Sequence, residues 1–458
     1  MKHSFFIFFL SLCIALPCFS AFAQPTDDVE PYMNSQTLES PEINAESAIL
    51  IDATTGEVLF EKNSKNKMYP ASITKLMTVL LALENGNLED VITFSHEAVY
   101  SIEPNSAHIA MQEGEQITLE QALYGILLRS ANEVSNAVAE YVDGSVAAFA
   151  QRMTQRAKEL GCETTNFVNA NGLFHENHYT SAFDMALIAK ELLTQDAYRK
   201  MMNATYYEIP PTNKQPEIRY LHGQHQMMNK NSIYYNEYAT GGKTGYVTEA
   251  LNTLVTFARK GDTELIAVVL KCNGAQHYVD TKALFEYGFA NYQTAKVLSA
   301  QDFAKSVEVV ETYKNKTSSL GNIIVSPVED VYKTISTNAN LANITIDVNY
   351  PETISAPVSA GQEVGTLTVK SGQKTISTIP LVAQTSMIET PQEARIAQEK
   401  ETRMKLVKMG GIVLLGIVLA SLILLCITRT VGYYKRKKRR KQRALRRKRQ
   451  RKITRCTK

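Results

Sequence analysis

The stretch Pro70-Ala71-Ser72-Ile73-Thr74-Lys75-Leu76-Met77-Thr78 opens a segment in which apolar residues recur at helical spacing. This pattern predicts a helix that begins near Pro70, buries one face and ends near Gly86. Ser72 and Lys75 are three residues apart, so they lie on the same side of the first turn. The stretch therefore places an amine next to a hydroxyl at a helix N-terminus, where backbone N–H groups are unpaired.

This pair of side chains has the chemistry of a nucleophile and its base. A serine hydroxyl becomes a nucleophile when a base removes its proton, and a lysine is such a base only while it is uncharged. The ordinary pKa of a lysine is about 10.4, so burial or a second cation must lower it. Many helices contain S-x-x-K by chance, and a catalytic interpretation therefore requires partner groups elsewhere in the chain.

Composition limits the classes of protein that fit this chain. The 458 residues leave room for two or three domains, and a hydrophobic content of 44% is typical of a globular protein. The net charge is +3, but seventeen Lys and Arg and no acidic residue lie in residues 429–458, so the remaining chain carries −14. An acidic body argues against a body that binds nucleic acid.

Both ends carry targeting signals. Residues 1–23 combine a basic start, an apolar run and an Ala-x-Ala site, which predicts a secretory signal peptide cleaved after Ala23. Residues 409–428 contain no charge and are long enough to span the cytoplasmic membrane. The basic residues after them should stay in the cytoplasm, next to anionic lipid, with residues 24 to about 408 outside. A tail that binds nucleic acid is the alternative explanation of the basic run.

The order of the elements predicts an α+β fold. Strand patterns at 48–51 and 57–60, helical patterns up to about residue 193 and a hairpin at 253–271 indicate helices packed on an antiparallel sheet. Residues 205–238 are rich in tyrosine and are expected to be irregular. Short Val, Ile and Thr runs then indicate a small β-rich domain. The predicted boundaries are signal peptide 1–23, linker 24–44, main domain 45–293, β-sandwich-like domain 296–385, helical stalk 388–408, transmembrane helix 409–428 and basic tail 429–458.

The cysteines and histidines give weaker signals. Cys162 and Cys272 are the two cysteines between the signal peptide and the predicted span, and the sequence leaves open whether they pair or stay buried thiols. His175-x-x-His178 and His222-x-x-His225 have the spacing of metal ligands, but a third ligand is not evident. We therefore prefer loop or core histidines, and we expect no metal and no cofactor.

A second polar cluster, Ser130-Ala131-Asn132, lies at the break between two helical patterns. A hydroxyl at this point can pass a proton from a lysine to a leaving amine, and the amide can hold a substrate carbonyl. Taken alone, the cluster is better explained by helix capping, which Ser and Asn do well.

The third cluster is Gly241-Gly242-Lys243-Thr244-Gly245, expected to start or edge the sheet. Glycines let a backbone approach a ligand closely, and Lys243 with Thr244 suits a carboxylate. Lys243 would also lower the pKa of Lys75. Taken alone, a tight turn with a solvated lysine is the simpler explanation. A phosphate-binding loop is disfavoured because Glu237 stands where its upstream glycine should be and no helix pattern follows.

The three clusters occur 58 and 113 residues apart in a chain with signals for export and anchoring. In this combination the chain resembles the active-site serine penicillin-recognising enzymes, which carry S-x-x-K, S-x-N and K-T-G. It is most similar to the low-molecular-mass serine D-alanyl-D-alanine carboxypeptidases of the Peptidase S11 family, over roughly residues 40–385. Further matches are Leu128-Arg129, Asn171-Gly172-Leu173 and Asp184-Met185-Ala186.

The chain departs from the family pattern at three points. Glu133 follows S-x-N where the family often has Asp, and Glu249-Ala250-Leu251 follows K-T-G-x-x-T where Ala-Gly is common. The family anchor is commonly an amphipathic helix that lies on the membrane, whereas a full span is predicted here.

The resemblance implies a β-lactamase/transpeptidase-like domain that carries out a two-step acyl transfer on a peptidoglycan stem pentapeptide. Ser72 would attack the carbonyl of the penultimate D-alanine, with Lys75 as base and Ser130 as proton relay. The N–H groups of Ser72 and Tyr246 would form the oxyanion hole, and β-lactams would trap Ser72. The substrate-binding residues implied in this way are Asn132, Lys243, Thr244, Gly245 and Tyr246.

Three alternatives stay open. A β-lactamase needs a glutamate that activates water, for which Glu163 and Glu176 lie in a plausible region. An endopeptidase or transpeptidase would act on cross-linked substrate. A catalytically silent, membrane-tethered protein that binds the cell wall would keep the fold without the reaction.

Overall fold

The computed structural model describes residues 38–339 and 344–453. The predicted signal peptide, most of the predicted linker and residues 454–458 lie outside the described residues. Two compact units are present: residues up to Val297 together with Tyr332–Ala342 form the first, and Leu298–Val331 together with the chain from Asn343 onward form the second. The predicted domain boundaries stay a prediction.

A five-stranded antiparallel sheet, in the order β2-β1-β9-β8-β7, is the centre of the first unit. The predicted strands and the predicted hairpin are present, and the glycine-rich third cluster forms the edge strand. The bounds are β1 Ser47–Asp52, β2 Val58–Lys62, β7 Ala239–Val247, β8 Leu251–Lys260 and β9 Thr263–Cys272. The predicted arrangement of helices on an antiparallel sheet is confirmed.

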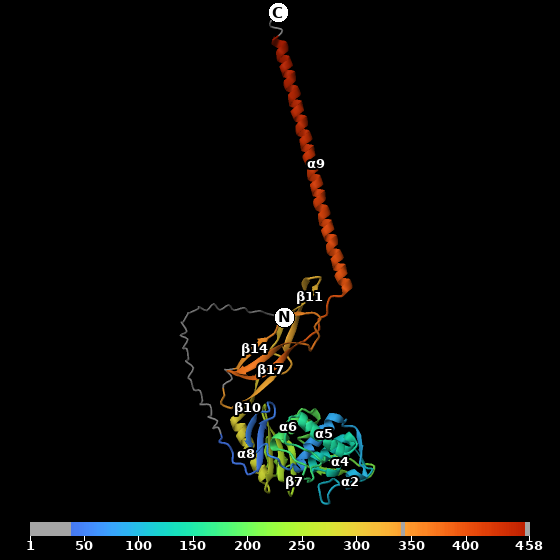
Figure 1. Ribbon diagram of the computed structural model, residues 1–458, viewed down its shortest axis with the longest axis vertical. Helices are drawn as coiled ribbons and strands as arrows, with labels where there is room; N and C mark the ends of the chain where they lie inside the picture. Colours follow the sequence, from blue (N-terminus) through green and yellow to red (C-terminus); the bar gives the residue numbers. More distant parts are fainter. Residues whose placement is uncertain (1–37, 340–343, 454–458) are drawn as a thin grey trace, which may run out of the picture. The chain divides into compact units, whose positions relative to one another are not determined.

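Helices cover both faces of this sheet. Figure 1 shows α8 on one face and α4, α5 and α6 on the other. Alternation along the strands produces the two layers, because Val255 and Phe257 pack in the large helical core while Leu254 and Ala258 pack with Leu284 of α8. The helices are η1 Ala71–Thr74, α1 Lys75–Asn85, α2 His96–Tyr100, α3 Leu119–Arg129, α4 Asn132–Asp143, α5 Val146–Glu159, α6 Ala182–Leu192, α7 Asp196–Met201, η2 Gln226–Met228 and α8 Gln276–Asn291.

The helix starts follow local chemistry. Thr118 and Gln121 form a capping box at the start of α3, and Ser181 accepts from the N–H of Asp184 at the start of α6. The predicted helix at Pro70 is split, however. Ser72 lies in the 3₁₀ turn η1, and the α-helix begins only at Lys75. Ala71 in this turn has φ +51°, a left-handed conformation that a regular α-helix cannot contain.

The expectation that residues 205–238 are irregular is wrong in part. They contain β5 Tyr206–Ile209 and β6 Arg219–His222, which pair antiparallel, and the short turn η2. Tyr207 stacks on Tyr124 at 3.9 Å, and Arg219 forms a buried ion pair with Glu115. Tertiary contacts that a local pattern does not reveal therefore order this hairpin. A second small pair, β3 Val91–Thr93 and β4 Gln116–Thr118, lies beside α3.

The second unit contains the predicted β-rich region. A six-stranded sheet in the order β14-β16-β17-β12-β11-β15 encloses a core that includes Val307, Val309 and Ile323. Its strands are β11 Lys305–Tyr313, β12 Lys316–Pro327, β14 Ile344–Asn349, β15 Thr353–Ser355, β16 Glu363–Ser371 and β17 Lys374–Ala383. A separate pair of strands, β10 Tyr292–Leu298 and β13 Val331–Ser336, belongs almost entirely to the first unit.

One helix, α9 Gln392–Ile453, contains most of the predicted stalk, the predicted span and most of the basic tail (Figure 1). Among the described residues it is the one helix long and apolar enough to cross a membrane, with a mean hydropathy of 2.9 over its apolar window. Cys162 and Cys272 are buried and unpaired, which answers the question that the sequence left open.

Candidate active site

The turn that carries Ser72 is held against strand β7 and a loop of the helical layer. Thr253 Oγ1 donates to the carbonyl of Pro70 at 2.8 Å. A Cβ added at Gly245 of β7 would lie 2.8 Å from the backbone nitrogen of Ser72, and one added at Gly172 would overlap the carbonyl of Ala71. Glycine at both positions therefore allows the close approach that fixes the turn. Ser72 itself is only half-buried, so its hydroxyl stands at the surface of the site.

Lys75 is fully buried and joins the first two clusters. Its Nζ lies 3.0 Å from Ser72 Oγ and 2.7 Å from Asn132 Oδ1, and it also donates to the carbonyl of Asn171. Burial first, and then the charge of Lys243, hold the pKa of Lys75 well below its usual range, while Glu133 opposes them. The arrangement favours an uncharged amine at this position.

The partners of Lys75 also decide where its lone pair points. A neutral amine has two N–H groups and one lone pair. Asn132 Oδ1 and the carbonyl oxygen of Asn171 can only accept, so they take the two N–H groups. Ser72 Oγ is the partner that can donate, and the lone pair therefore faces its proton. This geometry suits removal of a proton from Ser72.

The second cluster occupies the break between α3 and α4, as expected. Ser130 ends α3 in a left-handed conformation with φ +59°, and α4 begins at Asn132. The Oγ of Ser130 is buried and has no hydrogen-bond partner among the described residues. A buried hydroxyl without a partner is costly unless a ligand or water supplies one. Asn132 is not simply a cap, because its side chain binds Lys75.

The third cluster lies along edge strand β7. Lys243 is buried, its Nζ donates to the carbonyl of Thr244 at 2.8 Å, and burial lowers its pKa to about 7. Thr244 and Gly245 are half-buried, and the side chain of Tyr246 is exposed. Gly245 is the member that approaches Ser72, and Lys243 acts on Lys75 through its charge. The structure thus brings all three clusters to one region.

Two groups were missed as site residues in the sequence. The carbonyl of Asn171 accepts from Lys75, and its side-chain Nδ2 donates to Asn136 Oδ1 at 3.0 Å. The signal was the Asn171-Gly172 pair, since Gly172 has φ +83° and lies against Ala71. Glu133 is buried, accepts from the N–H of Ile109 at 2.7 Å, and burial raises its pKa.

The histidines with metal-like spacing have structural partners. His178 Nε2 bonds Thr74 Oγ1 at 2.8 Å, directly beneath the Ser72 turn, and His225 Nε2 bonds Thr256 Oγ1 at 3.0 Å. Burial lowers the pKa of each to about 3, so both rings are uncharged.

Comparison with known proteins identifies the family. The model of the family "D-alanyl-D-alanine carboxypeptidase" (Peptidase_S11) matches residues 34–274, and that of "Penicillin-binding protein 5, C-terminal domain" matches residues 292–389. The D-alanyl-D-alanine carboxypeptidase DacF of Bacillus subtilis (strain 168) is 32% identical over 75% of this chain and 86% of its own length. DacA of Escherichia coli (strain K12) is 31% identical over 75% of this chain and 83% of its own.

A solved structure gives the same result for the fold. Penicillin-binding protein 5 from Haemophilus influenzae superimposes with a TM-score of 0.60 and 26% identity, over 77% of this chain and 100% of that chain. The predicted transpeptidase-like domain followed by a β-rich domain is thus confirmed. The chain belongs to the D-alanyl-D-alanine carboxypeptidase family, Peptidase S11, and is a serine-type carboxypeptidase of the penicillin-binding protein group.

Proposed function

We propose that this chain removes the terminal D-alanine from peptidoglycan stem pentapeptides through an acyl-enzyme on Ser72. The observation that carries the proposal is the fully buried amine of Lys75, which lies 3.0 Å from Ser72 Oγ and whose pKa is held well below its usual range by burial and by the charge of Lys243. Relatives named D-alanyl-D-alanine carboxypeptidases supply the substrate class.

The reaction has two steps. Lys75 takes the proton of Ser72 as Oγ attacks the carbonyl of the penultimate D-alanine. The amide bond breaks, and Ser130, whose hydroxyl has no other partner among the described residues, passes a proton to the departing amine. Water then attacks the ester on Ser72, the acid is released, and Lys75 returns to its starting state.

The remaining site residues bind the substrate. Lys243 and Thr244 hold the terminal carboxylate, and Asn132 holds the acyl side. The backbone N–H groups of Ser72 and Tyr246 stabilise the oxyanion, and the close approach of Gly245 to Ser72 supports this placement. Loss of one such donor typically lowers the rate about 10²–10³-fold. A β-lactam mimics the dipeptide and traps Ser72.

The experiment replaces the nucleophile. We expect Ser72→Ala to release no D-alanine from a synthetic pentapeptide and to take no label from fluorescent penicillin. Ser135→Ala is the matched control, because Ser135 is a buried serine of the neighbouring α4 whose hydroxyl bonds the Ala131 carbonyl. Retained labelling of Ser72→Ala contradicts the proposal, and rapid turnover of the penicillin by the wild-type chain indicates a β-lactamase instead. Glu163 and Glu176, the carboxylates considered for that reaction, are both exposed.

We also propose that α9 anchors the enzyme to the cytoplasmic membrane. Residues 409–428 would span it, the signal peptide would export residues 24 to about 408, and the basic tail would remain inside against anionic lipid. The support is the apolar, fully exposed middle of α9, followed by seventeen basic residues. We expect the full chain to stay with membranes after carbonate extraction and a chain ending at residue 391 to leave them. Retention of the shortened chain contradicts the anchor.

A further inference from the structure

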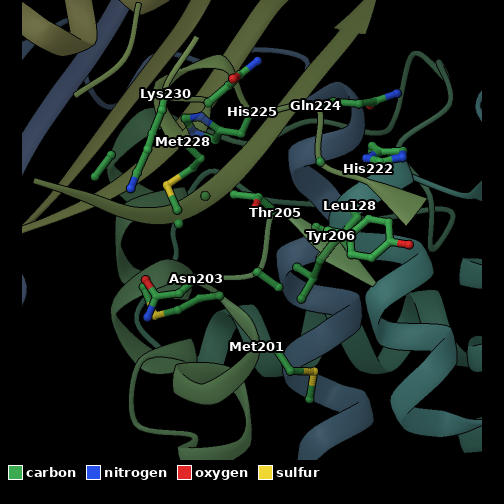
Figure 2. Close-up of a pocket in the computed structure, with 18 of the residues that line it drawn as sticks. Leu128, Met201, Asn203, Thr205, Tyr206, His222, Gln224, His225, Met228 and Lys230 are labelled. Atoms are coloured by element: carbon green, nitrogen blue, oxygen red, sulfur yellow. The ribbon is translucent and has the colours of Figure 1, made fainter. Parts of the chain in front are cut away.

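A cavity of about 910 Å³ opens beside the candidate active site, and the reaction proposed above does not use it. Its floor is apolar and buried, formed by Leu128, Met201 and Met202. Figure 2 shows Thr205 near the middle, with Lys230 and Met228 on one side and Leu128 and Tyr206 on the other. The cavity therefore combines an apolar floor with a polar rim, the usual composition of a small-molecule subsite.

The position of the cavity relative to Ser72 follows from strand β7. Gly245 lies against Ser72, and Gly241 and Gly242, on the other side of Lys243, line the cavity. Gly245 follows Gly242 by three residue steps along the strand, which corresponds to about 10 Å. Leu128, in the floor of the cavity, lies two residues before Ser130. Along β7, Gly245 beside the nucleophile comes first. Thr244 and Lys243, which are proposed to hold the carboxylate, come next, and the glycines that line the cavity follow.

Glycine at two positions of β7 lets this strand pack closely against the segments that line the cavity. A Cβ on Gly241 would lie 2.7 Å from the carbonyl of Met202, and one on Gly242 would lie 2.8 Å from His225 Nε2, so any side chain at either position would displace a wall. His225 lines the cavity, and its buried Nδ1 has no hydrogen-bond partner among the described residues. A group that enters the cavity can supply the partner that this nitrogen lacks.

The size of the cavity does not match the leaving group of the proposed reaction. The side chain of D-alanine is one methyl, similar in size to a water molecule, which occupies about 30 Å³. In a peptide that ends in another D-amino acid, the side chain and the carboxylate leave the same Cα. When Lys243 and Thr244 hold that carboxylate, a longer side chain can reach past them along β7.

We propose that this cavity is a subsite for the leaving group, and that it takes the side chain of a terminal D-amino acid larger than alanine, with an apolar stem and no charge. The inference rests on the proposed function, because the same amide bond breaks, the same ester forms on Ser72, and the same proton passes to the departing amine. It adds a substrate class: stem peptides that end in D-methionine or a residue of similar shape.

The test compares two peptides on the purified full-length chain in detergent. One ends in D-Ala-D-Ala and the other in D-Ala-D-Met, and the released amino acid is quantified by mass spectrometry. Burial of each methylene strengthens binding about fourfold. We therefore expect kcat/KM for the D-methionine peptide to be at least threefold higher than for the D-alanine peptide. A value equal to or below that of the D-alanine peptide overturns the inference.

A variant that fills the cavity tests whether a preference for the D-methionine peptide depends on the cavity. Thr205→Trp adds bulk near the middle of the cavity, and we expect it to lower the ratio of the two kcat/KM values at least fivefold. Thr317→Trp, on an exposed position of β12, is the matched control, and circular dichroism checks that both variants fold. An unchanged ratio in a folded Thr205→Trp overturns the inference.

Failure of the proposed function gives a different result. In that case neither peptide loses its terminal residue. If only the cavity inference fails, the D-alanine peptide is cleaved normally while the preference for D-methionine, or its sensitivity to residue 205, is missing.

Discussion

Lys75 and Lys243 are two buried lysines of one site, but their surroundings differ. Lys75 lies at the start of α1 and contacts three oxygen atoms from three different segments, at Ser72, Asn132 and Asn171. Lys243 lies on edge strand β7 and donates to the carbonyl of its own neighbour, Thr244. The first amine is fixed by the helical layer, whereas the second has donors left for a ligand.

The difference assigns the two lysines different tasks. An amine that is held by acceptors on two sides and faces a hydroxyl on the third is suited to be a base. An amine with spare donors beside an open strand edge is suited to hold an anion. The two are also coupled, because the charge of Lys243 lowers the pKa of Lys75. Substitution of each lysine in turn tests whether the two tasks are separate.

Removal of the base should have the largest effect. We expect Lys75→Met to slow both D-alanine release and penicillin labelling by about 10³-fold or more, since general-base catalysis contributes roughly 10²–10⁴-fold. The measurement is the time course of labelling with fluorescent penicillin. Lys190→Met serves as control, because Lys190 is a half-buried lysine on α6 that lies near Gly56. A loss smaller than tenfold means that another group removes the proton of Ser72.

The sequence alone predicts those parts of the fold and of the site that depend on local patterns. Period-two and helical spacing predicted β1, β8, β9 and most helices. Motif spacing predicted which three clusters meet. Each of these signals is local, or is a combination of short motifs whose residue types are dictated by one chemistry.

The rest depends on contacts between distant segments. One partner of Lys75 is the backbone carbonyl of Asn171. Because every residue has a backbone carbonyl, the residue type does not reveal this contact. The Ser72 turn is 3₁₀ rather than α-helical because Thr253 and Gly172 hold its backbone from outside. The β5–β6 hairpin is ordered by Glu115, more than 100 residues away, through Arg219. Patterns in a short window cannot report such contacts.

Removal of Lys243 should lower the activity less than removal of Lys75, and it should also change the pH dependence of labelling. We expect Lys243→Met to lower kcat/KM for the pentapeptide about 10²-fold, because one charged contact to the carboxylate is lost. The labelling rate falls at low pH as Lys75 takes up a proton, and we call this part of the pH profile the acid limb. The acid limb should move to higher pH in Lys243→Met, since the pKa of Lys75 rises when its cationic neighbour is gone.

Labelling rates between pH 5 and 10 measure this shift. Lys260→Met, which removes an exposed lysine of β8, is the control. An acid limb that stays in place shows that the two lysines are not coupled, and that Lys243 serves only the substrate.

The smallest effect concerns stability. Burial lowers the pKa of Lys243 to about 7 in the folded chain, whereas the unfolded chain keeps a value near 10.5. Between these values the unfolded state binds one more proton, so stability rises with pH, by at most about 1.4 kcal/mol per pH unit for this group. Below about pH 7 both states carry the proton and the contribution of Lys243 to the slope disappears.

Thermal unfolding followed by circular dichroism between pH 6 and 10 tests this contribution. The wild-type chain should gain stability relative to Lys243→Met as pH rises above 7, and the variant should be the more stable one at pH 6, because it buries no charge. Lys260→Met should follow the wild-type curve. Parallel curves for the wild type and Lys243→Met would mean that Lys243 keeps its proton when buried. Lys243 would then stay charged over this pH range, and its charge would continue to lower the pKa of Lys75.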